Sequence, residues 1–285
     1  MKRTGFIVFL ACCCLLSEGL SCCLGAEYQL SMLPRYSTEE IYKRITPLVE
    51  YLNKATGLSI KPTMTSTFDQ YTKALLGGKI AIGFENPYIY VLASRNHEAV
   101  AMAVKGKDGD KFRGIIITAA NSPLHSLADL KGKKIAIVGY TSAGGYLSQK
   151  LSLLQKGIDV TTDCHIEAAP ENKQENVVFS VFTGDVDAGF IRESALHKVD
   201  QFVPPGSIKV LAHTQWLPNW ALSISRLMAP ADREKIIKAI RNIPQESPVL
   251  RALRIKAFKP AKDSDYNLVR KAAGLISPTT DEPAN

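Results

Sequence analysis

The residues best suited to chemistry lie in one short stretch, Gly-Tyr-Thr-Ser-Ala-Gly-Gly at positions 139–145. A buried strand is expected before it at 135–138, and apolar residues recur at helical spacing after it, from Tyr146 to Leu154. The free N–H groups and the positive dipole end of a helix start attract anions, and small side chains let a ligand approach that backbone. The stretch therefore predicts an anion site in which Thr141 or Ser142 caps the helix and offers a hydroxyl. An ordinary capped helix after a strand fits the same residues.

Two α/β units of similar order must position this loop. A capping box, Ser37 with Glu40, begins a long predicted helix in the first unit. The strand expected at 80–84 leads into a helix that starts at Pro87, and the strand expected at 186–191 repeats the pattern in the second unit. Alternating strands and helices are typical of a parallel sheet with crossover helices.

This alternation divides the chain into two lobes. The first is predicted to comprise residues 27–119 and 215–277 and the second residues 120–214, followed by a loose polar tail at 278–285. Two crossings, near 119 and at 212–215, would act as a hinge between the lobes. Ligands of open parallel sheets bind outside the carboxyl ends of the strands, so a ligand cleft is expected where such ends meet.

Length and composition indicate an exported soluble protein. The chain has 285 residues, 46% of them hydrophobic and 22% charged, which suits one large or two medium globular domains. Lys2 and Arg3 precede an apolar run at 5–16, so residues 1–26 are expected to be an export signal that is too short to span a membrane comfortably. The predicted location is periplasmic or otherwise extracytoplasmic.

The cysteines are concentrated in the predicted signal. Five of the six cysteines lie in the signal, and the body of the chain keeps Cys164 alone, so no internal disulfide is expected. The sequence Leu-Ser-Cys-Cys at 20–23 resembles a bacterial lipoprotein signal, which makes Cys22 or Cys23 a candidate for lipid attachment and membrane anchoring. Plain cleavage after Ala26 explains the same segment.

Charge and motif content argue against several function classes. The net charge is +8, but basic residues are scattered without interleaved aromatic residues, so no nucleic-acid partner is expected. The five histidines stand apart from cysteine or aspartate partners at motif spacing, and no Gly-x-Ser-x-Gly occurs. Cys164 and His165 lack a second pair that would complete a zinc site. We therefore predict no metal, no cofactor and no enzymatic activity.

Several short segments stand out in order along the chain. They are Pro-Leu-Val-Glu-Tyr-Leu at 47–52, Lys-Ala-Thr-Gly at 54–57, Asn-Pro at 86–87 with Tyr-Val-Leu-Ala at 90–93, Leu-Ala-Asp-Leu-Lys-Gly at 127–132, and Gly-Tyr-Leu at 145–147. Together and in this order they resemble the substrate-binding proteins of phosphonate, phosphite and phosphate-type ABC importers. The resemblance covers most of residues 28–273. It implies an α/β periplasmic binding protein of type II fold, with two lobes that are each a mostly parallel sheet flanked by helices.

The resemblance also implies which loop residues bind the ligand. The three hydroxyl positions of the family's loop correspond to Ser142, Ala143 and Gly144, so only the first keeps its hydroxyl, with Thr141 beside it. Each lost charge-assisted hydrogen bond removes roughly 1.5–3 kcal/mol, which weakens the case for a phosphonate. The backbone amides at the helix start survive the change.

Four further contacts follow from the same resemblance. Two tyrosines that contact the oxyanion in phosphonate binders are replaced here by Phe68 and Phe112. A histidine position falls near Gln174. An acidic residue that meets the substrate amine in that family falls near Trp220.

Three candidates complete the predicted site. Tyr90, together with the aromatic residues above, can form a more apolar or cation-accepting pocket, in which Glu85 would meet a positive group. Arg192, at the end of a strand that faces the cleft, can hold a carboxylate or an oxyanion. Core packing of the aromatic residues and a surface ion pair of Arg192 explain the same positions.

We therefore predict the extracytoplasmic solute-binding component of an ABC-type importer. It would be a monomer that closes two lobes on a small, phosphonate- or phosphate-like oxyanion and delivers it to a membrane permease. The alternative is a ligand-sensing module for a membrane receptor or kinase, with a ligand other than a phosphonate. An exported enzyme is the third hypothesis. Ser142→Ala or Trp220→Ala is expected to weaken binding without unfolding the protein.

Overall fold

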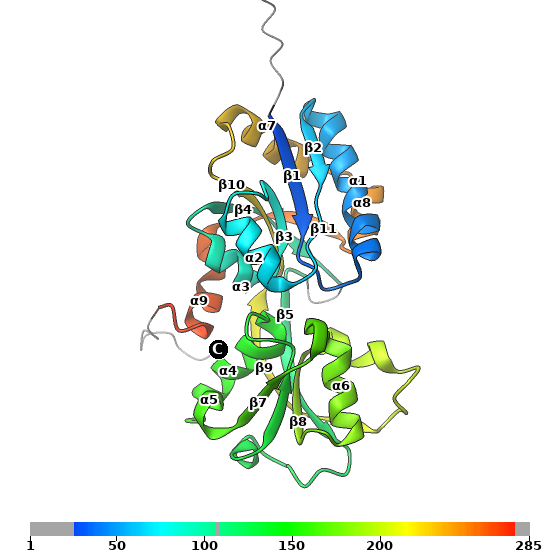
Figure 1. Cartoon of the computed structure of the whole chain (residues 1–285), viewed down its shortest axis with the longest axis vertical. Coiled ribbons are helices and arrows are strands. Elements are labelled where there is room, and N and C mark those ends of the chain that lie inside the picture. Colours follow the sequence, from blue (N-terminus) through cyan, green and yellow to red (C-terminus); the bar gives the residue numbers. More distant parts are fainter. Residues whose placement is uncertain (1–25, 107–108, 277–285) are drawn as a thin grey trace, which may run out of the picture.

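The computed structural model describes residues 26–106 and 109–276, which form two lobes that follow one another along the long axis of the molecule (Figure 1). The predicted export signal up to residue 25, with Cys22 and Cys23, and the predicted tail at 278–285 lie outside the described residues. Within the part of the chain that is described, no helix is long and apolar enough to cross a membrane.

The first lobe is built on a mixed six-stranded sheet in the order β11-β4-β10-β3-β1-β2. Its strands are β1 (Glu27–Met32), β2 (Ser59–Pro62), β3 (Ile82–Glu85), β4 (His97–Val104), β10 (Ala221–Ser225) and β11 (Ala257–Pro260). β1 pairs in parallel with β2 and β3, whereas β10 runs antiparallel to β3 and β4, and β11 antiparallel to β4. The helices of this lobe are α1 (Thr38–Thr56), α2 (Phe68–Leu76), α3 (Pro87–Ala93), α7 (Pro230–Arg241) and α8 (Pro248–Leu253).

The expected starts of α1 and α3 are both confirmed. The side chain of Ser37 accepts the backbone N–H of Glu40 and so caps α1. The side chain of Asn86 accepts two of the free N–H groups at the start of α3, and Pro87 occupies the first turn, where its missing N–H costs nothing. The second of these caps matters for function because α3 begins at the boundary between the lobes.

The second lobe is built on a mixed five-stranded sheet in the order β7-β6-β8-β5-β9. Its strands are β5 (Lys111–Ala119), β6 (Lys134–Ile137), β7 (His165–Ala168), β8 (Ala188–Arg192) and β9 (Ile208–Pro218). β6 pairs in parallel with β7 and β8, and β5 runs antiparallel to β8 and β9. The helices and short helical turns are η1 (Ala128–Leu130), η2 (Ala143–Leu147), α4 (Ser148–Leu154), α5 (Val160–Asp163), η3 (Pro170–Asn172), α6 (Gln174–Thr183) and η4 (Glu193–Val199).

Strand β5 corrects the predicted boundary between the lobes. The sequence pattern places residues up to 119 in the first lobe, but β5 pairs with β8 and β9 of the second sheet. The chain therefore crosses between the sheets after Val104 and again after Pro218, rather than near 119 and at 212–215. An apolar strand carries no signal of which sheet it joins, because both sheets bury such strands.

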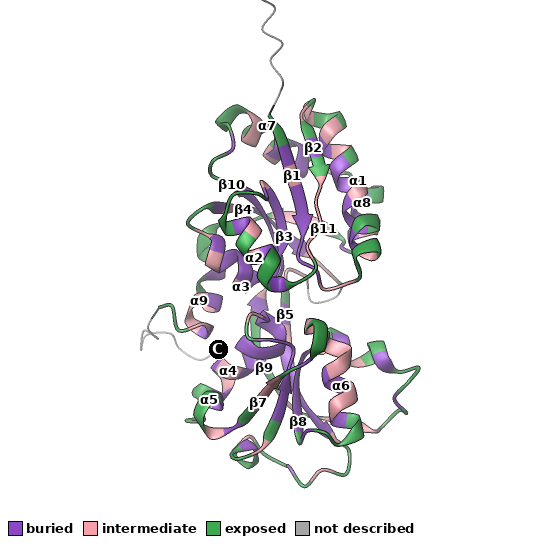
Figure 2. Cartoon of the chain, in the orientation of Figure 1, coloured by how far each residue is buried: buried purple, intermediate pink, exposed green. Residues whose placement is uncertain are grey.

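The lobes have separate hydrophobic cores, and a further cluster joins them. The inner strands of both sheets are largely buried, the edge strands β2, β7, β9 and β11 are less so, and the outer faces of the helices are exposed (Figure 2). The joining cluster combines Tyr90 of the first lobe with Phe112 and Ala143 of the second. It also includes Tyr266 and Val269 from the C-terminal segments η5 (Asp263–Tyr266) and α9 (Asn267–Ala272). Side-chain packing therefore continues from one lobe to the other beside residues 139–145, the predicted anion loop.

Candidate functional site

A cavity between the lobes contains the predicted anion loop. Its empty space, which includes open solvent at the mouth, is about 470 Å³. The predicted residues that line it are Phe68, Phe112, Ser142, Ala143, Gly144, Gln174, Arg192 and Trp220. Lining residues that were not predicted are Arg35, Asn86, Val138, Asn172, Glu175 and Lys198.

The anion loop follows β6 and opens the helical turn η2, which continues into α4. Oγ of Ser142 accepts the backbone N–H of Gly145 at 3.1 Å, so Ser142 is the cap. The N–H groups of Ala143 and Gly144 lie in the first turn, where a helix supplies no acceptor of its own. Both residues line the cavity, so these amides can donate to an anion, and the hydroxyl proton of Ser142 can do the same.

Close packing explains why two positions of this loop have no side chain. A Cβ atom at Gly144 would lie 2.7 Å from Cε2 of Phe112 and 3.3 Å from Cβ of Arg192. One at Gly145 would lie 2.3 Å from Cγ2 of Val138. Glycine at these positions therefore lets the loop backbone lie directly against the side chains of the cavity wall. A larger residue would push the backbone and those side chains apart.

Arg192 lies at the end of β8 and is 7% exposed. Its guanidinium carbon is 4.1 Å from the centroid of the Phe112 ring, a cation–π contact that orients the charge over the aromatic face. The backbone N–H of Arg192 donates to Oε1 of Gln174, the first residue of α6, at 2.8 Å. The structure thus brings three predicted residues together at one wall of the cavity.

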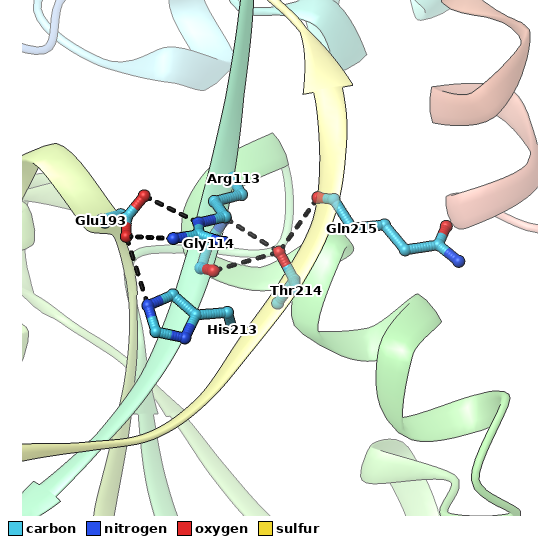
Figure 3. A network of polar contacts seen from close by, with 6 residues as sticks. All are labelled: Arg113, Gly114, Glu193, His213, Thr214 and Gln215. Carbon is cyan, nitrogen blue, oxygen red and sulfur yellow. Dashed lines mark hydrogen bonds and ion pairs between the residues drawn. The ribbon is translucent and has the colours of Figure 1, made fainter. Parts of the chain in front are cut away.

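A polar network behind this wall fastens β5 to the end of β8 (Figure 3). Arg113 donates two hydrogen bonds to the carboxylate of Glu193, at 2.8 and 2.7 Å, and Nε2 of His213 lies 3.2 Å from the same carboxylate. In the chain, Arg113 follows Phe112 and Glu193 follows Arg192. The network therefore fixes the positions of Phe112 and Arg192 relative to each other.

A second contact in the network stabilises an irregularity of the sheet. The register of β5 against β9 shifts between Arg113 and Ile115. Oγ1 of Thr214 accepts the backbone N–H of Gly114 at 2.9 Å and so replaces a bond of the ladder at that point (Figure 3). Such irregularities change the direction of nearby side chains, and this one lies two residues from Phe112.

The first lobe contributes the opposite wall. The ring of Trp220 packs edge-on against Phe84, with centroids 5.4 Å apart, and the guanidinium carbon of Arg35 lies 5.3 Å from the Trp220 centroid. Nδ2 of Asn86 donates to the backbone oxygen of Thr141 at 3.2 Å. This hydrogen bond links the start of α3 in one lobe to the anion loop in the other.

The described residues that line the cavity carry more positive than negative charge. Arg35, Arg192 and Lys198 line it with one carboxylate, Glu175, which pairs with Lys198 at 3.0 Å. Burial, and then the charges of Arg35, Arg192 and two further cations, hold the pKa of Lys105 well below its ordinary value. These cations therefore act on a common region, and an anion bound there would relieve their mutual repulsion.

Three predicted contacts lie outside the cavity lining, which corrects their placement. Thr141 contributes its backbone oxygen to the bond with the start of α3. Glu85 is fully buried, and the hydroxyl of Tyr71 donates to it at 2.7 Å, so it does not face a ligand. Tyr90 is also fully buried, and its hydroxyl donates to Asp263 at 2.7 Å. The predicted strand and helix are present, but both side chains pack into the protein.

The sequence pattern also missed the segment after β7. Glu171 and Asn172 both adopt left-handed backbone, at φ 56° and 54°, and Nδ2 of Asn172 donates to the backbone oxygen of Val138 at 2.9 Å. Asparagine tolerates this backbone better than most residues, so Asn172 could have signalled a turn. Strained backbone often occurs at binding sites. No local pattern marks Glu175 or Lys198 as cavity residues.

Two α/β lobes with a ligand cavity between them define a periplasmic binding protein of type II fold. Residues 30–266 match the family model described as ABC transporter, phosphonate, periplasmic substrate-binding protein. The chain therefore belongs to this family. It is the extracytoplasmic solute-binding component of an ABC-type importer, with a small-molecule ligand and a membrane permease as partners.

Known relatives agree with this assignment. The chain is similar to the phosphate-import protein PhnD of Mycolicibacterium smegmatis, with 22% identity over 221 residues that cover 73% of this chain and 68% of the relative. PhnD1 of Prochlorococcus marinus in complex with methylphosphonate has a TM-score of 0.74 at 14% identity, and the match covers 87% of this chain and 97% of that one. XAC2383 of Xanthomonas citri bound to ATP has a TM-score of 0.73 at 18% identity, with 87% and 96% covered. At these identities the solved structures support the fold alone.

The family assignment confirms the predicted resemblance, fold class and importer function. It favours the importer over the sensor and over the exported enzyme, because the family is one of transport binding proteins. Among the described residues, no group of three or more His, Cys, Asp or Glu side chains is placed to hold a metal ion.

Proposed function

We propose that the cavity binds the phosphoryl group of inorganic phosphate or of a simple alkylphosphonate. The observation that carries the proposal is that Arg35, Arg192 and Lys198 line the same cavity as the helix-start amides of Ala143 and Gly144, with Glu175 as the one carboxylate among the described lining residues. Two relatives support the ligand class, since one is described as a phosphate-import protein and another was solved with methylphosphonate.

Each side of the cavity would contribute a different kind of contact. The amides of Ala143 and Gly144 and the hydroxyl of Ser142 would donate to phosphoryl oxygens. Arg192 and Arg35 would balance the charge from opposite lobes. A charge-assisted hydrogen bond contributes roughly 1.5–3 kcal/mol, so two well-placed cations can offset the two hydroxyls that the loop lacks relative to the resembled family.

The site is expected to disfavour phosphonates that carry an amine. The one carboxylate among the described lining residues, Glu175, is already engaged by Lys198 at 3.0 Å. Trp220 stands where the resemblance places an acidic residue that meets an amine, and Arg35 lies beside its ring. An ammonium group would therefore enter a region that is already positive.

Isothermal titration calorimetry with phosphate, methylphosphonate, 2-aminoethylphosphonate and methanesulfonate tests the proposal. Phosphate or methylphosphonate should bind, and 2-aminoethylphosphonate should bind more weakly. Ser142→Ala should weaken binding about tenfold, because it removes one charge-assisted donor. The absence of binding by both phosphoryl anions would contradict the proposal.

Ser247→Ala is a matched control for Ser142→Ala. Ser247 caps α8 by accepting the N–H of Leu250 at 3.3 Å, and it lies outside the cavity lining. Both variants should lose about 1 kcal/mol of unfolding free energy through the lost cap. Only Ser142→Ala should lose affinity; equal affinities in the two variants would contradict the role of Ser142.

Trp220 calls for a gentler substitution than the predicted one. Its side chain is 4% exposed and packs against Phe84, and truncation of a buried aromatic residue to alanine costs about 3–5 kcal/mol. Trp220→Phe keeps most of that packing and changes the cavity wall. A change of affinity in this variant, with at most a small loss of stability, is the expected result.

We also propose that the protein does not turn over its ligand. ³¹P NMR spectra of the ligand after a long incubation with the protein would test this.

For the location of the mature protein we propose two alternatives. The protein is attached to the membrane through a lipidated Cys22 or Cys23, or it is released after cleavage behind Ala26. The intact mass of the mature protein distinguishes the two, because only the first form carries a diacylglyceryl cysteine at its start. The monomeric state stays a prediction that light scattering tests.

A further inference from the structure

The ligand cavity continues into an outer groove at the mouth of the cleft. The groove encloses about 930 Å³, counted to open solvent, and it shares Arg35, Glu175 and Lys198 with the inner cavity. Its other lining residues are Tyr36, Ser37, Glu40, Arg44, Lys173 and Arg254. The groove therefore lies between the start of α1 and the end of α8 in the first lobe and the start of α6 and η4 in the second.

Cations gather around one aromatic ring in this groove. The guanidinium carbons of Arg44 and Arg35 lie 4.2 and 5.0 Å from the centroid of the Tyr36 ring, and Nζ of Lys198 lies 5.5 Å from it. Burial raises the pKa of Tyr36, but the four surrounding cations, Arg254 included, outweigh burial and leave that pKa below its ordinary value. The phenol therefore lies in a strongly positive potential to which both lobes contribute.

The carboxylates among the described residues balance this charge only in part. Of these residues, five cationic side chains and two carboxylates line the groove. Glu40 is shared by Arg44 at 2.7 Å and Arg254 at 3.6 Å, and Glu175 is engaged by Lys198 at 3.0 Å. Lys173 pairs with Glu171, which lies outside the groove lining, at 2.5 Å. Five cations therefore share three carboxylates. The remaining positive charge has solvent on one side and the inner cavity on the other, so an anion can reach it from either.

We propose that the outer groove is a second anion subsite and that the natural ligand carries two anionic groups, a phosphoryl group in the inner cavity and a carboxylate or second phosphoryl group in the groove. This inference rests on the proposed function, because the inner group is the one assigned to Ala143 and Gly144. The three shared lining residues place the two spaces in direct continuity. A ligand with two charges a few bonds apart would neutralise both clusters, which a single phosphoryl group cannot do.

Methylphosphonate and phosphonoacetate are the matched probes, because the second adds one carboxylate to the first. Calorimetric titrations at a fixed ionic strength of about 0.15 M keep the screening length constant at roughly 8 Å. Phosphonoacetate should bind to the wild-type protein about tenfold more tightly than methylphosphonate.

Two variants test the outer groove without touching the inner cavity. Lys173 and Arg254 line the groove only, and their side chains are 41% and 73% exposed, so Lys173→Gln and Arg254→Gln should leave the fold intact. Because exposed charge pairs contribute up to about 1 kcal/mol, each variant should weaken phosphonoacetate binding about threefold and the double variant about tenfold. Methylphosphonate binding should change by less than twofold.

The double variant Lys238→Gln with Arg241→Gln is the charge-matched control, since both residues are exposed on α7 and line neither space. It should leave both dissociation constants unchanged. If it weakens phosphonoacetate as much as the groove variants do, the effect is one of net charge and the subsite is overturned.

The outcomes separate this inference from the proposed function. Methylphosphonate binding with no advantage for phosphonoacetate, or with phosphonoacetate insensitive to the groove variants, overturns the outer subsite and leaves the proposed function standing. Failure of methylphosphonate to bind, with phosphonoacetate binding that the groove variants weaken, overturns the single-phosphoryl function and supports the subsite. Failure of both probes to bind overturns both proposals.

Discussion

Substitution of Gly144 by alanine tests the packing of the anion loop directly. The new Cβ would lie 2.7 Å from Cε2 of Phe112, closer than real Cβ contacts allow, and 3.3 Å from Cβ of Arg192. Phe112 is 4% exposed and cannot simply swing into solvent. Overpacking of this kind costs about 1–3 kcal/mol, so Gly144→Ala should fold but should lose that much unfolding free energy.

The effect on binding should exceed the effect on stability. The ring of Phe112 and the side chain of Arg192 must move away from the loop, and the amide of Gly144 moves with it. Loss of one charge-assisted hydrogen bond to the ligand corresponds to roughly 1.5–3 kcal/mol, or about ten- to 150-fold in dissociation constant. Calorimetric titration with phosphate and methylphosphonate, beside urea denaturation, measures both quantities.

Gly132→Ala provides a control for general destabilisation. Gly132 has left-handed backbone at φ 73°, and a Cβ there meets nothing within 4 Å. The strain should cost about 1–2 kcal/mol, similar to the cost at Gly144, without any change at the cavity. A folded Gly144→Ala protein with wild-type affinity would refute the placement of the ligand against this loop.

Three further predictions concern groups around the cavity. Burial raises the pKa of Glu85 from 4.5 to about 7, so the folded protein keeps a proton that the unfolded chain releases; unfolding free energy should fall by about 3 kcal/mol as pH rises from about 4.5 to above 7, and Glu85→Gln should remove that fall. Between about pH 4 and 6.5, His97, whose pKa burial lowers from 6.5 to about 4, gives a slope of opposite sign that nearly cancels this fall in the wild-type protein. Urea denaturation should therefore show only the last part of the fall, about 1 kcal/mol, above pH 6.5, and the difference between the wild-type protein and Glu85→Gln measures the rest. Asn86→Ser keeps a capping oxygen for α3 but loses the bond to Thr141, so stopped-flow measurements should show about fivefold faster ligand release at nearly unchanged thermal stability, and an unchanged rate would count against the link. Glu193→Gln weakens the paired bonds from Arg113 and should cost about 1 kcal/mol of stability and two- to threefold in affinity; a loss of stability alone would show that the network does not position Arg192.

Features decided by one element were predictable from the sequence. The anion loop could be found because a cap, small residues and a helix start adjoin in the chain, and Ser142 caps the helix as expected. Arg35 follows the carboxyl end of β1, so the rule that ligands bind beyond strand ends could also have found it.

Features decided by tertiary contacts were not predictable. Glu85 ends a strand that was expected, but the direction of its side chain depends on the hydroxyl of Tyr71, which reaches it from α2. Tyr90 lies on an expected helix, yet it pairs with Asp263 from a distant part of the chain. The sequence pattern of β5 fits either sheet, because an apolar run indicates that a strand is buried but not which strand it pairs with.

We expect the distribution of charge between the lobes to couple ligand binding to lobe closure. Arg35 belongs to the first lobe, whereas Arg192 and Lys198 belong to the second. Two unit charges about 8 Å apart repel by about 2 kcal/mol at an effective dielectric constant of about 20, so closure of the empty site brings like charges together at a cost. The bond from Asn86 to Thr141 contributes about 1 kcal/mol in the opposite direction, and the hydrophobic cluster that joins the lobes adds to it. A phosphoryl anion between the lobes turns each repulsion into an attraction, so the same cations that provide affinity also make closure depend on the ligand.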